Sequence, residues 1–136
     1  MADLVITAAN VVKTSGVSVE GTAGATITAG TPIRIDASDS NELKESDCTT
    51  SATTAGVDGI ALNNASDGQP LTYLKSGGVM NLGATLAVGK IYVLSTSGGI
   101  APVDDLTTAD YTTVLGVATT TALITLAITA SGVQVP

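Results

Sequence analysis

Apolar and polar residues alternate along this chain in short runs, with a period of two residues. The runs are separated by Gly, Ser, Asp and Asn, which favour turns. No window of eleven or more residues has the apolar spacing of an amphipathic helix. The pattern therefore predicts strands, and we expect them near residues 4–7, 17–20, 25–28, 33–36, 59–62, 71–75, 79–82, 91–94, 100–103, 113–118 and 122–129.

Two Gly-containing segments between these runs predict hairpin turns, at residues 75–79 and 96–100. Residues 36–56 form a long connection rich in Asp, Glu, Ser and Thr, and loops of this length are uncommon and often functional. We therefore expect no strand there.

A short segment of the chain occurs twice. Residues 24–30 read GATITAG and residues 83–89 read GATLAVG, 59 positions later. A second pair follows in the same order, because the Gly-Ile-Ala at Gly59 corresponds to the Gly-Val-Ala at Gly116. Two copies are too few for a solenoid, which needs at least about 3 repeats. We predict an all-β fold, a small single-domain β-barrel or β-sandwich with pseudo-twofold internal duplication.

The duplication divides the chain into an N-terminal extended arm, residues 1–20, and a single β domain, residues 21–136. The half-repeats cover about 24–80 and 83–135. In the second half-repeat, Ile91 and Val93 lie between Tyr92 and Leu94, so both faces of that strand are apolar. An apolar second face needs cover, from another chain or from the N-terminal segment of this one.

Composition narrows the possible partners. The formal net charge is −7 and the five basic residues are scattered, so the surface repels phosphate backbones and anionic lipids. We expect no nucleic acid and no membrane partner. The N-terminus lacks a basic region followed by an apolar one, and the longest apolar-rich run is too short to span a bilayer. The expected site of synthesis and folding is a cytoplasm.

Candidate catalytic chemistry is sparse. The chain has no His, so Cys48 has no base to make its thiolate, and no usual zinc ligand set exists. The carboxylates of residues 36–47 lack the spacing of an EF-hand, which favours a solvated acidic loop. Asp104, Asp105 and Asp110 lie in a stretch that follows Pro102 and is typical of a turn, and the chain has almost no aromatic residues to build the pocket of a glycoside hydrolase. We expect no enzyme activity, no cofactor and no metal.

Several elements resemble the small capsid cement, or head decoration, proteins of tailed bacteriophages. The resemblance covers about residues 24–130 and consists mostly of glycines and aliphatic residues at turns and strands. Its elements are Ala29-Gly30-Thr31-Pro32, Gly59-Ile60-Ala61, Gly68-Gln69, residues 83–92, residues 99–102 and Gly116-Val117-Ala118. The family has no active-site residues to transfer.

The resemblance implies a structural protein on the outer surface of a phage head, made in the host cytoplasm. It would bind the major capsid protein and itself, as a homotrimer, and stabilise contacts between capsomers. The N-terminal segment would lie across a neighbour, and strands 4–7 and 17–20 offer edges for β-augmentation. The predicted capsid or partner contacts are Leu4, Val5, Ile6, Val17, Val19, Ile91 and Val93.

Two other functions remain open from the sequence. One is a carbohydrate- or host-surface-binding module of a phage fibre or adhesin, although sugar binders usually present exposed aromatic side chains and this chain has only three Tyr. The other is an assembly module of a tail or baseplate.

Overall fold

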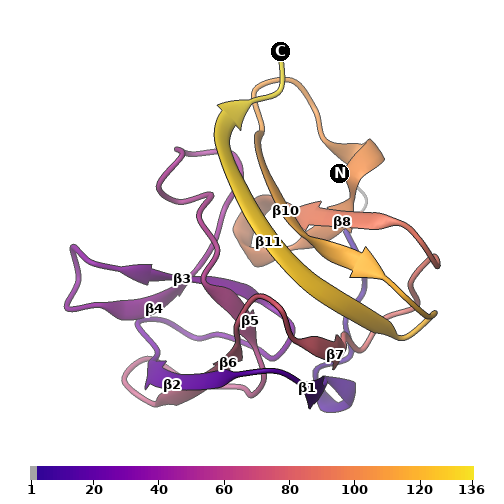
Figure 1. Ribbon diagram of the computed structural model, residues 1–136. Helices are drawn as coiled ribbons and strands as arrows, with labels where there is room; N and C mark the ends of the chain where they lie inside the picture. The colour runs from indigo at the N-terminus through magenta and orange to yellow at the C-terminus, as the bar shows by residue number, and fades with distance from the viewer. Residues whose placement is uncertain (1–2) are drawn as a thin grey trace.

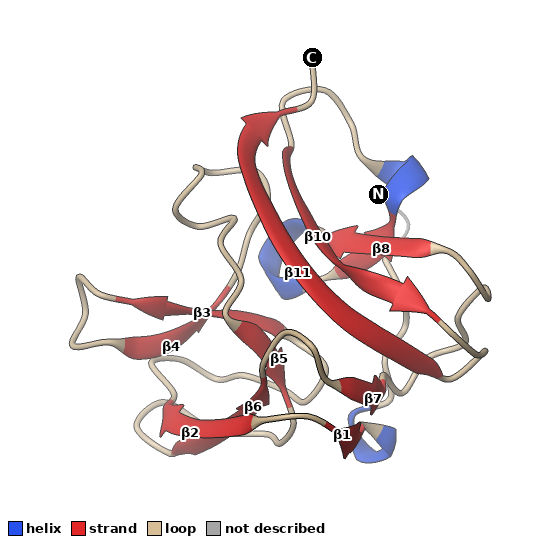
Figure 2. Cartoon of the chain, viewed as in Figure 1, coloured by secondary structure: helices blue, strands red, loops and turns tan. Residues whose placement is uncertain are grey.

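The computed structural model describes residues 3–136 and consists almost entirely of strands and loops (Figures 1 and 2). Three 3-10 helices of one turn each are η1 (Ala8–Asn10), η2 (Thr96–Gly98) and η3 (Val103–Asp105). The strands are β1 (Val12–Ser15), β2 (Ser18–Thr22), β3 (Pro32–Asp36), β4 (Glu42–Glu45), β5 (Gly59–Ala61), β6 (Pro70–Leu74), β7 (Val79–Asn81), β8 (Ile91–Leu94), β9 (Ile100–Pro102), β10 (Tyr111–Ala118) and β11 (Leu123–Gln134). The predicted all-β class is confirmed.

The strands form two antiparallel sheets packed as a sandwich rather than a closed barrel. The five-stranded sheet has the order β2-β6-β5-β3-β4, and the six-stranded sheet has the order β1-β7-β11-β10-β8-β9. Figure 1 shows the first at the lower left and most of the second at the upper right. The five-stranded sheet curls, because Ala23, just after β2, forms an isolated bridge with Leu43 of β4.

The two half-repeats pair their strands in the same register. In the first half, Ile33 of β3 lies opposite Gly59 of β5. In the second half, the equivalent Tyr92 of β8 lies opposite the equivalent Gly116 of β10. The hydrogen bonds beside these pairs repeat too: Gly30 donates to the Ala61 carbonyl at 2.8 Å, and Gly89 donates to the Ala118 carbonyl at 2.7 Å. The repeated sequence therefore encodes one supersecondary unit used twice.

The buried side chains repeat in the same way. The core of the five-stranded sheet contains Ile27, Ile33, Leu43, Ala61 and Tyr73. Their equivalents in the second half, by sequence and strand register, are buried together in a larger core: Leu86, Tyr92, Ile100, Ala118 and Ile124. A third, smaller cluster joins Cys48 and Ala55 to Leu94.

The predicted N-terminal arm belongs to the sheets for part of its length. Residues 12–22 run beside residues 70–81, so that β1 pairs with β7 in one sheet and β2 with β6 in the other. The chain crosses between sheets at Gly16, where an added Cβ would meet the Cα of Gly78 at 2.5 Å. Burial of a backbone at such close approach requires glycine.

Four other local predictions need correction. Residues 4–7 lie outside any strand, and residues 25–28 contribute only the bridge between Ile27 and Ala65. The connection 36–56, where no strand was expected, contains β4. This strand pairs with β3 although most of its side chains are charged. Residues 75–79 do not close a hairpin, because β6 and β7 lie in different sheets. The turn at 96–100 does join two paired strands, β8 and β9.

Candidate interaction surface

Cys48, the one thiol of the chain, lies in the interior. Its side chain has no exposed surface, and burial, with the negative charges of Asp110 and Asp47, raises the pKa of the thiol to about 11. A nucleophilic cysteine needs a thiolate near neutral pH. The environment of Cys48 favours the neutral thiol and a packing role.

The carboxylates named above serve local structure. Asp110 is buried and accepts hydrogen bonds from the Thr107 backbone N–H at 2.9 Å and from its hydroxyl at 2.8 Å. Asp104 pairs with Lys90. In the acidic segment, the ammonium nitrogen Nζ of Lys44 lies 2.7 Å from Oδ2 of Asp39 and 3.9 Å from Oδ2 of Asp36. Over residues 3–136, no three His, Cys, Asp or Glu side chains come together in an arrangement that could hold a metal ion.

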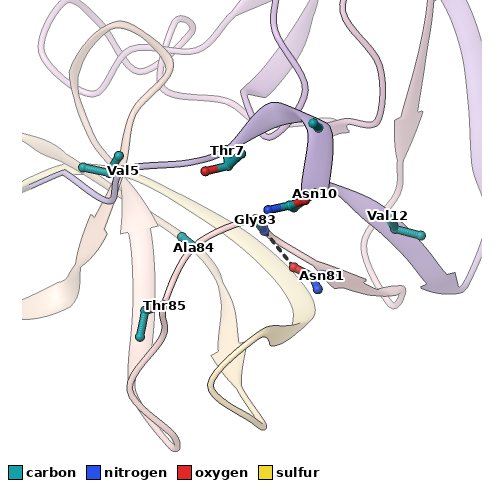
Figure 3. Close-up of a pocket in the computed structure, with 9 residues that line it drawn as sticks. Val5, Thr7, Asn10, Val12, Asn81, Gly83, Ala84 and Thr85 are labelled. Carbon is teal, nitrogen blue, oxygen red and sulfur yellow. Dashed lines mark hydrogen bonds between the residues drawn. The ribbon is translucent and has the colours of Figure 1, made fainter.

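A groove of about 530 Å³ lies between the N-terminal segment and the chain just after β7 (Figure 3). Asn81 accepts a hydrogen bond from the Gly83 N–H at 2.9 Å on one side, and η1 borders the other. The groove is lined by aliphatic, amide and hydroxyl side chains and one glycine. These residues are Val5, Thr7, Ala9, Asn10, Val12, Asn81, Gly83, Ala84 and Thr85. The lining holds no titratable side chain, so it offers contact surface rather than acid–base chemistry.

The N-terminal segment lies on its own chain and forms one wall of this groove. The Leu4 N–H donates to the Ile100 carbonyl at 2.7 Å, and the Thr7 N–H donates to the Gly83 carbonyl at 2.8 Å. Leu4 and Ile6 are half-buried against the large core, whereas Val5 points outward and is 88% exposed. Within this chain, then, the segment covers the core, and it presents Val5 to solvent.

Residues 12–22 form the edge of both sheets. Val17 is exposed, and Val19 is half-buried against the core of the five-stranded sheet. The Val17 carbonyl accepts from the Lys75 N–H, and Ala23 exchanges hydrogen bonds with residues 68 and 69. Because the direction of backbone groups alternates along a strand, the N–H groups of Ser18 and Glu20 point away from β6, toward the free side.

The two remaining predicted contacts have opposite environments. Ile91 is 40% exposed on the outer face of the six-stranded sheet. Val93, two residues along the same strand, has no exposed surface, and η3 lies against β8. The chain itself therefore covers the apolar face at Val93 and leaves it open at Ile91.

Sequence reasoning missed three exposed valines that extend this surface: Val12 of β1, Val88 before β8, and Val117 of β10. Val117 lies opposite Ile91 in the ladder. The signal for Val88 and Val117 was present in the repeat, since both align with residues of the first half, but only the packing of the halves reveals that their environments differ.

Comparison with known proteins adds no relative. No protein-family model matches the chain, and no curated protein is detectably similar to it in sequence. Within residues 3–136, the structure has no helix of the length and hydrophobicity needed to cross a membrane.

Proposed function

We propose that this chain is a structural capsid decoration protein that binds the outer surface of a tailed-phage head. It stabilises contacts between capsomers, associates with itself as a homotrimer, and performs no catalysis. The observation that carries the proposal is the edge that residues 12–20 form across both sheets, which is exposed except at the half-buried Val19. An extended strand of a capsid subunit can add to such an edge through main-chain hydrogen bonds.

The other edges are less suited to strand addition. At the β9 edge, the Ile100 carbonyl already accepts from the Leu4 N–H. The β4 edge carries Glu42, Lys44 and Glu45 and bends toward Ala23. Charged side chains and bends protect an edge from pairing. Residues 18–22 carry a single charge, that of Glu20.

Weak contacts suffice for this role. An assembly of several copies contacts several capsid subunits at once, so that individually weak contacts combine through their effective concentration. The net charge of −7 supports an exterior position, away from packaged DNA.

Binding of carbohydrate, the alternative, has less support from the aromatic side chains. Tyr73 and Tyr92 are both buried, and the Tyr92 hydroxyl accepts a hydrogen bond from the Ala87 N–H at 2.9 Å. Stacking on a sugar ring requires an exposed aromatic face, which leaves Tyr111 as the one half-exposed candidate.

The test uses heads produced by the phage or prophage that carries this gene. Ser18→Pro removes an N–H that faces away from β6, so the fold is retained while strand addition is blocked. We expect the wild type to co-sediment with heads and Ser18→Pro to bind at least about tenfold more weakly, a loss of about 1.4 kcal/mol. Ala37→Pro, at the second position of the exposed turn between β3 and β4, where proline is favoured, is the control at a distance from the edge.

Three outcomes contradict parts of this proposal. Absence of wild-type binding at saturating protein removes the capsid function, and labelled protein found on tails in electron micrographs assigns it to a tail or baseplate. Equal binding by Ser18→Pro removes the edge mechanism. Specific hits on a glycan array favour the carbohydrate-binding alternative.

A further inference from the structure

The two halves bury one equivalent surface to very different extents. In the first half, Pro32, Ile60 and Leu74 form a row across neighbouring strands of the five-stranded sheet. Ile60 and Leu74 are fully buried in the large core between the sheets, together with residues of the second half. This face of the first half is therefore an internal interface.

The equivalent row of the second half faces away from the body. Strand register places Ile91, Val117 and Thr125 at the positions of Pro32, Ile60 and Leu74. Val117 is 37% exposed, whereas its equivalent Ile60 has no exposed surface.

The loop before this strand repeats the contrast. Val88 is 65% exposed, whereas its equivalent Ala29 is 5% exposed. The second half thus keeps apolar residues, with a larger one at Val88, on a surface that residues 3–136 leave partly exposed.

Away from η3, which carries Asp104 and Asp105, this outer face is also uncharged. The ladder extends the row to Val79, and a second row on the same face contains Val12, Asn81 and Leu123. None of the seven residues in the two rows is ionisable, in a chain of net charge −7. Stacked repeats normally end in a polar outer face that keeps them soluble. The second half lacks that cap.

The first half lacks the leucines with which the second half receives it. Leu82, Leu115 and Leu126 help to form the core that receives Ile60 and Leu74. By the same register, the first half has Gly21, Asp58 and Lys75 at these three positions. A second copy therefore does not offer its first half as an apolar receptor, which rules out a head-to-tail stack that repeats the internal interface.

We propose that copies of this chain associate through the outer face of the six-stranded sheet, so that this face of each copy meets the same face of its neighbours around the three-fold axis of the proposed homotrimer. A copy that carries seven negative charges can approach another closely only through a neutral surface, and identical apolar faces cover each other. The inference rests on the self-association within the proposed function and is independent of capsid binding.

The experiment measures the mass of the full chain by light scattering across a concentration series. We expect wild-type protein to exceed the 13.3 kDa monomer mass and Val117→Glu to shift to it, because like charges would then face each other across the axis. Val133→Glu is the matched control, since Val133 is exposed on β11 outside this face. It should keep the wild-type mass. Circular dichroism verifies that each variant is folded.

A charge-reversed pair distinguishes this geometry from a general loss of solubility. Val117→Lys alone should also be monomeric, and an equimolar mixture with Val117→Glu should recover the higher mass. A wild type that remains at 13.3 kDa at its highest soluble concentration overturns the inference, as does a Val117→Glu variant of unchanged mass. A monomer that still binds phage heads would refute this inference and leave the capsid function intact.

Discussion

The two halves of the molecule have one architecture and two different surroundings. Ile33 and Tyr92 lie in equivalent pairs opposite Gly59 and Gly116, and an added Cβ at either glycine would overlap a carbonyl oxygen of the next strand. Equivalent residues thus hold equivalent places within each half. The comparison teaches that the repeat specifies the half, and that the contact between halves decides which apolar residues are buried.

The connections between equivalent strands show how the halves have diverged. Residues 46–58 join β4 to β5, and the shorter 103–110 join β9 to β10. The longer connection packs on the second half: the Tyr111 N–H donates to the Cys48 carbonyl at 2.7 Å, and the Thr113 hydroxyl donates to the Ala55 carbonyl. The connection that follows the acidic segment therefore forms a buried contact between the two halves.

The largest expected effect is on the reactivity of Cys48, which lies in this contact between the halves. At about pH 8, a disulfide reagent should label Cys48 on the order of a thousandfold more slowly in native than in urea-unfolded protein, because labelling requires opening of the structure. Burial removes access, and the pKa of about 11 removes thiolate. Rapid stoichiometric labelling of native protein would indicate that the connection opens independently of the sheets.

The contrast between equivalent faces can be measured as stability. Ile60→Ala removes a fully buried side chain and should lower the free energy of unfolding by about 2–5 kcal/mol. Val117→Ala, at the equivalent exposed position, should cost about 0.5 kcal/mol in dilute protein. Urea unfolding followed by circular dichroism gives both values. Equal losses would mean that the two faces are equally buried in solution.

Substitutions at the equivalent glycines Gly30 and Gly89 measure how closely the N-terminal segment packs on the first half. Both have positive φ, +90° and +80°, so substitution by Ala should cost each about 1 kcal/mol of strain. At Gly30, the new Cβ would also meet Cγ2 of Ile6 at 2.7 Å, whereas at Gly89 it meets nothing within 4 Å. We expect Gly30→Ala to cost about 1 kcal/mol more than Gly89→Ala.

A double-mutant cycle checks the cause of that difference. In an Ile6→Ala background the two glycine variants should become nearly equal, since the side chain that obstructs Gly30 has been removed. A difference that persists would place the extra cost elsewhere than in the N-terminal segment.

The smallest effect is a difference in acid sensitivity. The Ser38 hydroxyl, which donates to Asp36 at 2.6 Å, contributes most to holding the pKa of that carboxyl below 3.8, assisted by Arg34 and Lys44. Stability from a lowered pKa is present at neutral pH and lost as the pH falls through the folded-state value. Asp36→Asn should therefore lower stability slightly at neutral pH and reduce its acid dependence near ~pH 3.

Ser95 stands at the position equivalent to Asp36, so the second half lacks this carboxyl. Urea midpoints at the two pH values give the comparison. An Asp36→Asn variant with the acid dependence of the wild type would contradict the assigned role of this hydrogen bond.

Local sequence was a good guide where a strand has apolar residues at alternate positions. β8 begins and ends as expected. β3, β5 and β7 differ from their predicted ranges by one residue at one end, and β6 by one residue at each end. β4 was missed because Glu42, Lys44 and Glu45 surround a single buried Leu43. Residues 4–7 have strand-like alternation but no neighbouring strand to complete a ladder.

The candidate surface was predictable only in part. The N-terminal apolar residues and Ile91 were identified from the sequence, and the structure places Val5 and Ile91 at the surface. Val93 has the same residue type and alternation as an exposed position, but the fold covers it. No local signal separates these two residues, because the cover at Val93 comes from η3, ten or more positions farther along the chain.

The sequence alone determined the all-β class, the duplication and the absence of a histidine-based chemistry, because alternation, repeated glycines and composition are local properties of the chain. The tertiary structure alone decided that the halves stack as a sandwich, that residues 12–22 join both sheets, and that one of two equivalent apolar faces is left bare. Burial depends on which elements meet in space, and two nearly identical segments can meet different neighbours.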